Sequence, residues 1–140
     1  MGSRDGRLIA LNAQTGVPVP GFGNEGVINL RSGVADKSPN MPYHMSSPGV
    51  VYKNLIITGA QGQEDNPDGP AQDVRAWDVS TGKLVWTFHA VPHPGEPGYE
   101  SWPTNAWERA GSPANWGLIS IDEQRGLAFV PFGQDRKSVV

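Results

Sequence analysis

The chain has 140 residues and a formal net charge of −3 at pH 7, with 11 lysines and arginines against 14 acidic residues. It shows no basic cluster, which argues against a nucleic-acid partner, and its lack of cysteine excludes disulfide bonds and thiol chemistry. Glycine (18) and proline (13) are frequent, and no segment has a sustained helical period or the roughly 18 apolar residues of a membrane span. The sequence therefore predicts an all-β fold of short strands and turns.

A turn motif occurs twice along the chain. Residues 10–16 read Ala-Leu-Asn-Ala-Gln-Thr-Gly, and residues 76–82 read Ala-Trp-Asp-Val-Ser-Thr-Gly. In each copy a side-chain oxygen, of Asn12 or Asp78, can accept hydrogen bonds from backbone N–H groups two or three residues further on. The closing glycine provides the positive φ that a tight hairpin needs. One copy would be typical of an ordinary hairpin, whereas two copies flanked by strand-forming residues favour a repeated unit.

Two further hairpins complete the pattern, one at residues 48–59 and its counterpart at residues 116–130. The order along the chain is half a unit, a whole unit and half a unit, at residues 4–22, 46–88 and 116–133. The middle unit has the length of about 40–45 residues that is typical of a β-propeller blade. About two blades cannot close a propeller, so the sequence predicts part of a larger one.

Three segments do not follow the strand pattern. The polar loop 60–72 lies inside the whole blade, the insertion 89–115 follows that blade, and residues 135–140 form an atypical tail. Loops of this length in a compact domain are usually either functional or disordered. The insertion contains Trp102 and Trp107, and residues 104–109, which include Trp107, form a helix-like patch, so we expect the insertion to be ordered.

The insertion also contains two histidines, His89 and His93, that have the spacing of one helical turn. Pro92 and Pro94 exclude a helix at this point, because proline lacks the backbone N–H and clashes with the preceding turn. We therefore expect both histidines to be loop residues that pack or form hydrogen bonds, rather than metal ligands.

The second half of the chain carries the motifs of a known family. They are the sequence at 89–96, Trp-Pro-x-x-Ala-Trp at 102–107, Asn-Trp-Gly at 115–117, Asp-Glu-Gln-Arg-Gly at 122–126, and the repeat Ala-x-Asp-x-x-Thr-Gly-Lys-x-x-Trp at 76–86. With these motifs the chain resembles the dehydrogenases that depend on pyrroloquinoline quinone (PQQ), and among them the membrane-type quinoprotein glucose dehydrogenases. The resemblance extends from about residue 5 to residue 134.

This resemblance implies an eight-bladed propeller with PQQ near its axis and calcium, or another divalent cation, between the cofactor and the protein. It implies oxidation of a sugar or an alcohol on the periplasmic side, with electrons passed to the quinone pool of the respiratory chain. The parent enzyme would be membrane-associated through parts outside this chain.

The resemblance also points to individual cofactor-binding residues. Trp116 matches a tryptophan that lies flat against the PQQ ring system, with Asn115 beside it, and an indole face offers broad contact to a planar quinone. The alternative for such a tryptophan is packing between blades, which fits Trp86 better. Ser46 and Ser47 match a segment close to the carboxylates of the cofactor, with packing at the end of a strand as the alternative.

Two residues match positions connected with the metal. Glu64, in the polar loop, lies where related enzymes place acidic groups for the cofactor or its ion, and calcium prefers carboxylate and carbonyl oxygens. The alternative is a solvated acidic loop. Gln134 stands where several relatives have a metal-ligating asparagine, and its side chain has a different reach.

The catalytic aspartate of the family, and a lysine near the quinone, belong to later segments that this chain does not include. We therefore predict no catalytic residue here, an incomplete and inactive chain when alone, and the remaining propeller blades or other copies of the chain as partners. The alternative is a non-catalytic propeller scaffold built from the same repeats. A scaffold would not need Asn115 and Trp116 or the insertion with Trp102 and Trp107, so these features favour the dehydrogenase.

Overall fold

The computed structural model describes residues 2–63, 68–109, 111 and 113–133. Over these ranges the regular structure consists of short antiparallel strands and two 3₁₀ turns, without an α-helix. In chain order the elements are β1 (Arg7–Ile9), β2 (Val27–Asn29), β3 (Val50–Tyr52), β4 (Leu55–Thr58), β5 (Val74–Asp78), β6 (Leu84–Phe88), η1 (Tyr99–Ser101), η2 (Ala106–Arg109), β7 (Ser120–Asp122) and β8 (Leu127–Phe129). The predicted all-β fold is confirmed. None of the helices in the described ranges has the length and apolar character needed to cross a bilayer.

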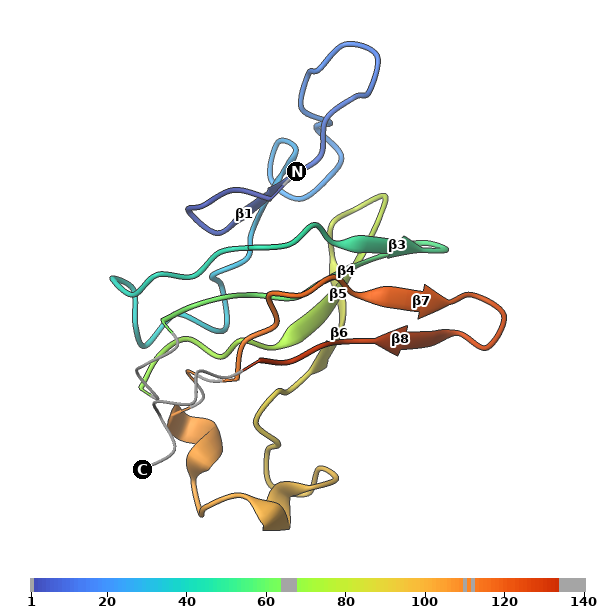
Figure 1. Ribbon diagram of the computed structural model, residues 1–140. Coiled ribbons are helices and arrows are strands. Elements are labelled where there is room, and N and C mark those ends of the chain that lie inside the picture. Colours follow the sequence, from blue (N-terminus) through green and yellow to red (C-terminus); the bar gives the residue numbers. More distant parts are fainter. Residues whose placement is uncertain (1, 64–67, 110, 112, 134–140) are drawn as a thin grey trace.

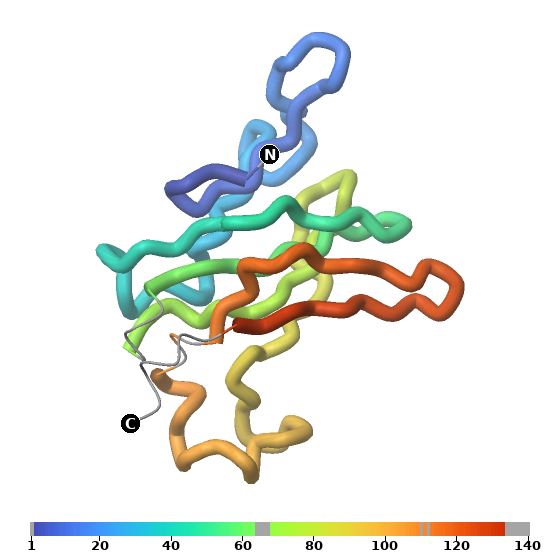
Figure 2. Tube along the Cα trace, in the orientation of Figure 1, coloured from blue at the N-terminus to red at the C-terminus, as the bar shows by residue number. Residues whose placement is uncertain are grey.

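The strands form three sheets that follow one another along the chain. β1 pairs with β2, the next four strands form one sheet in the order β3-β4-β5-β6, and β7 pairs with β8. The two-stranded ribbon β7–β8 lies across the four-stranded sheet, and the N-terminal part lies on the other side of that sheet (Figures 1 and 2). Each strand pairs with its neighbour in sequence, as expected for propeller blades.

The repeated turns have the predicted hydrogen bonds. Asp78 Oδ1 accepts from the backbone N–H of Ser80 at 3.0 Å and of Thr81 at 2.8 Å, and Gly82 has a φ of 70°. Asn12 Oδ1 accepts in the same way from the two N–H groups at positions 14 and 15, both at 3.0 Å. Where the chain reverses, the oxygen of the Asp or Asn side chain therefore accepts hydrogen bonds from backbone N–H groups of the turn, in place of a carbonyl oxygen of a neighbouring strand.

A third turn of the same kind joins β7 and β8. Asp122 Oδ1 accepts from the backbone N–H of Arg125 at 3.0 Å, and Gly126 has a φ of 69°. The Gly126 N–H donates to Asp122 O at 2.8 Å, and the closing glycines of the two earlier turns make the same bond at the same distance. The sequence analysis recognised this hairpin but not its turn as a copy of the motif, because arginine stands where the other copies have threonine.

The first hairpin differs from its prediction. The segment 4–22 was expected to contain both strands, but β1 pairs with Val27–Asn29, and the first turn is followed only by a single bridge between Leu11 and Pro18. Pro18 and Pro20 have no N–H to donate, so a ladder cannot continue through them. The chain turns again after these prolines before β2 pairs with β1.

Two apolar clusters cover the two faces of the four-stranded sheet. Ile56 and Ile57 are neighbours in β4 and point to opposite faces, as successive residues of a strand do. The first cluster joins the sheet to the N-terminal part, and its buried members are Leu8, Phe22, Ile28, Leu30, Tyr43, Ala60 and Trp77. The second joins the sheet to the β7–β8 ribbon through Ile57, Val74, Ala76 and Ile119. The sheet is therefore the middle layer of the described structure.

A buried arginine ties the N-terminal layer to this sheet. Arg75, in β5, is 3% exposed and donates to the carbonyl oxygens of Leu30 and Ser32 and to the Tyr43 hydroxyl, the last at 2.8 Å. Its guanidinium group lies 4.9 Å from the centre of the Trp77 ring, where a cation–π contact adds to the hydrogen bonds. Burial raises the pKa of Tyr43, so this phenol stays neutral and can accept from Arg75.

Candidate functional site

The candidate site lies at one end of two adjacent hairpins, where β3 and β7 begin and β4 and β8 end. A bridge between His44 and Gln61 extends the first hairpin toward this end, and a bridge between Ala114 and Gly133 extends the second. β3 and β7 are in contact and run in the same direction (Figure 1). The residues just before these two strands are therefore brought close together.

Trp116, which precedes β7, presents its indole ring at this end. The ring rests against Gly133: a Cβ atom at that position would lie 2.9 Å from Trp116 Nε1 and from Cζ2. Only glycine therefore lets the indole ring lie so close to the chain that follows β8. About half of the residue is open to solvent, since Trp116 is 51% exposed. Such an exposed aromatic face can bind a planar ring.

Asn115 and Ser47 fix the backbone on either side of this ring. Asn115 is 2% exposed and donates from Nδ2 to Pro131 O at 2.7 Å, and its backbone N–H donates to Ala60 O at 3.1 Å. Ser47 Oγ donates to the carbonyl oxygen of Trp116 at 2.6 Å. Asn115 lies against Gly59, where any Cβ would overlap its Oδ1 atom. The buried amide of Asn115 is thus used inside the protein, and its part in the site is to position Trp116.

The structure brings together three of the six predicted site residues, Trp116, Asn115 and Ser47. Ser46 directly precedes Ser47 in the sequence and is exposed. The two predicted metal ligands, Glu64 and Gln134, lie outside the described residues. Within the described part of the chain, no group of three or more acidic, histidine or cysteine side chains is placed to hold a metal ion.

Two glycines, Gly59 and Gly133, belong to this site and were missed by the sequence analysis. Each makes room for a side chain that is far from it in sequence, so neither has a local signal. The only available signal was that Gly59 directly follows a strand and that Gly133 follows a strand by a few residues, which is common in turns.

In the described part of the insertion after β6, a histidine pair packs against Trp107. The rings of His89 and His93 stack with centroids 3.7 Å apart, and the His93 ring lies 4.9 Å from that of Trp107. Glu96 bonds to both residues: one carboxylate oxygen lies 2.8 Å from His89 Nδ1, and the other accepts from the His93 backbone N–H at 2.8 Å. Trp107 lies in η2, within the patch expected to be helix-like. The two histidines pack and form hydrogen bonds, which confirms their predicted role.

This carboxylate gives the insertion a dependence on pH. The backbone N–H of His93, and then the bond to His89, lower the pKa of Glu96 below its ordinary value of 4.5. Folding therefore favours the ionised carboxylate, and the stabilisation is present above the ordinary pKa and lost as the pH falls through the folded one. We expect Trp107 fluorescence to report loosening of the insertion below about pH 4, the range of a carboxyl group.

The matched variant is Glu96→Gln, which cannot ionise. In this variant the acid-dependent change should disappear, with the fluorescence at neutral pH already shifted toward that of an exposed indole. If the two proteins show the same fluorescence profile between pH 6 and about pH 3, Glu96 does not control the order of the insertion.

Comparison with known proteins identifies the family. A family model described as "PQQ: Glucose/ethanol/alcohol dehydrogenase, beta-propeller domain" matches residues 1–139. The chain belongs to this family. The match covers both hairpins at the Trp116 site and confirms that the fold is made of blades of a larger quinoprotein propeller.

Individual relatives of this PQQ-family chain agree. The quinate/shikimate dehydrogenase (quinone) of Acinetobacter baylyi is 34% identical over 137 residues, which are 96% of this chain and 16% of that protein. The quinoprotein glucose dehydrogenase of Gluconobacter oxydans is 36% identical over 140 residues, 92% of this chain and again 16% of the relative. The crystal structure of quinohemoprotein alcohol dehydrogenase from Comamonas testosteroni matches with a TM-score of 0.66 and 26% identity, over 94% of this chain and 19% of that one. The chain thus spans about one sixth of the length of the curated relatives that it matches.

Proposed function

We propose that this chain forms part of the floor and wall of the PQQ site in a dehydrogenase that oxidises a sugar, such as glucose, or an alcohol. The observation that carries the proposal is the half-exposed ring of Trp116, held against Gly133 at the meeting point of two hairpins. The family match and the dehydrogenase names of the relatives support it over a non-catalytic scaffold.

The residues present fit a planar cofactor. Trp116 would provide the flat apolar surface, Asn115 and Ser47 would hold its backbone in place, and Ser46 would offer an exposed hydroxyl to a carboxylate. PQQ, when bound, supplies the quinone that accepts a hydride from the substrate. A divalent cation, calcium in this proposal, would take oxygen ligands from Glu64 and Gln134.

The blades are assigned within the same proposal. Residues 4–22 and the strand after them belong to one blade, residues 46–88 form a whole blade, 89–115 are an insertion, and 116–133 begin a third blade. The remaining blades would supply the general base and the rest of the cofactor pocket. The complete enzyme would work in the periplasm, associated with the membrane, and pass electrons to the quinone pool.

Replacement of Trp116 by alanine tests this function directly. In the protein that carries this segment together with its remaining blades, we expect Trp116→Ala to weaken PQQ binding at least severalfold, measured by equilibrium titration of the cofactor. Loss of one aromatic stack costs about 0.5–1.5 kcal/mol beyond the area that it buries. The melting temperature should change little, because the ring is half exposed.

The matched control is Trp86→Ala, which removes an indole ring from β6, away from the candidate site; Trp86 is 36% exposed. Its PQQ affinity should equal that of the wild type. Unchanged PQQ affinity in Trp116→Ala together with a large fall in melting temperature would assign Trp116 to packing and remove the basis of the proposal.

The open side of the third sheet leads to an expectation about assembly. In the described structure β8 pairs only with β7, and Leu127 and Phe129 on it are 48% and 56% exposed. An unpaired strand edge with apolar side chains promotes pairing with other chains. We expect the isolated chain to self-associate, with an average mass in sedimentation equilibrium that rises with concentration.

A charge on this strand should reduce the association. Phe129→Lys places a lysine at the edge, whereas Val17→Lys changes a residue of 58% exposure in the first turn region and serves as the control. A wild-type chain that sediments as a monomer with a sharp cooperative melt, or equal effects of the two variants, would contradict this expectation.

A further inference from the structure

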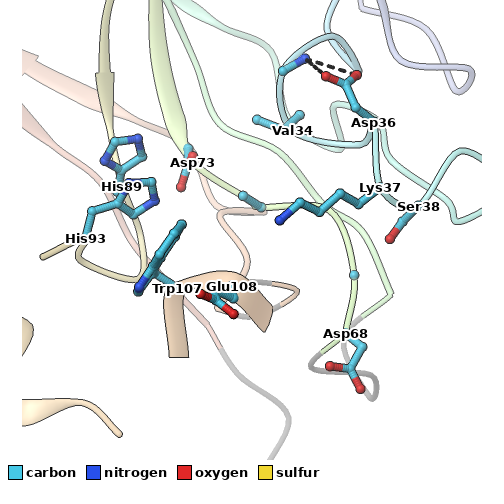
Figure 3. A pocket seen from close by; sticks show the side chains of 13 residues that line it. Val34, Asp36, Lys37, Ser38, Asp68, Asp73, His89, His93, Trp107 and Glu108 are labelled. Carbon is cyan, nitrogen blue, oxygen red and sulfur yellow. Dashed lines mark hydrogen bonds between the residues drawn. The ribbon is translucent and has the colours of Figure 1, made fainter. Parts of the chain in front are cut away.

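A cavity of about 490 Å³ lies apart from the Trp116 site and shares no lining residue with it (Figure 3). It opens where β5 begins and β6 ends, since Asp73 directly precedes β5 and His89 directly follows β6. The loop with Lys37 forms one wall, and the insertion with Trp107 and Glu108 forms the opposite one. Its volume is within the range of about 300–1,000 Å³ that is typical of small-molecule sites.

The walls of the cavity are joined by hydrogen bonds, so the site is already formed. Ala71 donates its backbone N–H to Val34 O at 3.3 Å, which connects the first loop to the segment before β5. Ala90 donates its backbone N–H to Asp73 Oδ1 at 3.0 Å, which connects that segment to the insertion. A preformed cavity loses little conformational entropy when a ligand binds.

Two polar side chains at the cavity have bonding capacity that the described residues do not use. Asp73 is 5% exposed and accepts one hydrogen bond at Oδ1, while no described residue donates to its Oδ2 atom. Lys37 is an exposed residue that points its amine into the cavity and forms no ion pair with a described residue (Figure 3). Trp107 lines the cavity with its ring, while its Nε1 atom is buried out of reach of solvent. The cavity therefore offers a ligand one acceptor and one donor beside an apolar ring.

The cavity is lined by acidic, basic and aromatic side chains, and this combination indicates which class of ligand it can bind. Asp73 and Glu108 repel an anion, and Lys37 repels a cation placed in the centre. A hydroxyl group both donates and accepts, so several hydroxyls can satisfy the carboxylate of Asp73 and the amine of Lys37 together. The indole ring of Trp107 and the His93 ring beside it offer apolar surface to the C–H groups of the same molecule.

We propose that this cavity binds a neutral polyhydroxylated molecule of the size of a pyranose sugar, with Asp73 as acceptor, Lys37 as donor and the Trp107 ring as apolar contact. No chemical step takes place there, and binding requires neither PQQ nor a metal ion. The cavity is thus an accessory sugar site, independent of the function proposed for Trp116.

Saturation-transfer NMR on this chain tests the proposal, with D-glucose as the probe and choline and acetate as a cationic and an anionic comparison. The method detects weak ligands of large particles, so self-association does not hide the signal. We expect saturable transfer to the ring protons of glucose that exceeds transfer to either comparison molecule. It should fall severalfold in Lys37→Met and in Trp107→Ala, which changes only a partly buried residue of the insertion.

Two controls separate this site from others. Trp102→Ala removes an indole of 37% exposure in the same insertion that does not line the cavity, and should leave the transfer unchanged. Trp116→Ala should also leave it unchanged, even if that variant abolishes PQQ binding, so the two proposals fail independently. Absence of saturable transfer to glucose, equal transfer in Lys37→Met and the wild type, or stronger transfer to choline would overturn the accessory site.

Discussion

The chain alone is expected to show no measurable dye-linked oxidation of glucose or ethanol when PQQ and calcium are supplied. The family resemblance implies that the general base lies in a segment outside this chain, and the loss of a general base alone costs a factor of about 10²–10⁴ in rate. The site is also incomplete, because the chain spans 16% of the length of its quinoprotein relatives and Trp116 is left 51% exposed. Water would therefore reach any cofactor bound on this surface.

The measurement is dye reduction under the conditions used for a complete quinoprotein glucose dehydrogenase, such as that of Escherichia coli, which is 31% identical over 130 residues. PQQ binding is measured in parallel on the same sample, so that an inactive chain that binds the cofactor is distinguished from one that does not. Turnover by this chain near the rate of the complete enzyme would show that its own residues supply the base.

Replacement of Arg75 should give the largest change in stability of any single substitution considered. Arg75→Met keeps most of the apolar stem but leaves Leu30 O, Ser32 O and the Tyr43 hydroxyl without their donor. Each buried acceptor left unpaired costs roughly 1–3 kcal/mol, so the total should reach several kcal/mol. The buried Nε atom of Arg75 has no partner among the described residues, and its removal offsets a part of this cost. The expected result is a large fall in the urea midpoint.

The control for this variant is Arg125→Met, which removes an ion pair to Asp122 from a side chain of 76% exposure. Exposed ion pairs contribute little, so its urea midpoint should stay within error of the wild type. Tyr43→Phe removes only the hydroxyl and should fall between the two. Equal midpoints for Arg75→Met and Arg125→Met would show that the buried contacts do not stabilise the layers.

The parts of the fold that depend on local chemistry could be predicted from the sequence. The Asp78 and Asn12 turns needed only an oxygen, a glycine and their spacing, and both have the expected bonds. The partner of β1 could not be predicted in this way. Proline at position 18 ended one ladder, but the return of the chain to Val27–Asn29 depends on contacts with the four-stranded sheet.

Residues of the candidate site could be predicted from the sequence only where the residue type and its sequence neighbours form a recognisable motif. Trp116 was proposed because a tryptophan after asparagine matched a family motif, whereas the hydrogen bond from Ser47 to its carbonyl oxygen was not predicted. Gly133 and Arg75 were not found, because their importance comes from partners 17 and 45 positions away in the sequence. The sequence around each of these two residues does not show which distant residue it will contact, because that depends on how the sheets pack against one another.

The position of the Arg75 partners also fixes an order of events during synthesis. Leu30, Ser32 and Tyr43 all precede Arg75 in the chain, so they have left the ribosome before β5 can form. The hairpins close through sequence neighbours, so β5 can pair with β4 as soon as it has been synthesised. The acceptors that the buried guanidinium group needs are therefore already available when Arg75 is synthesised.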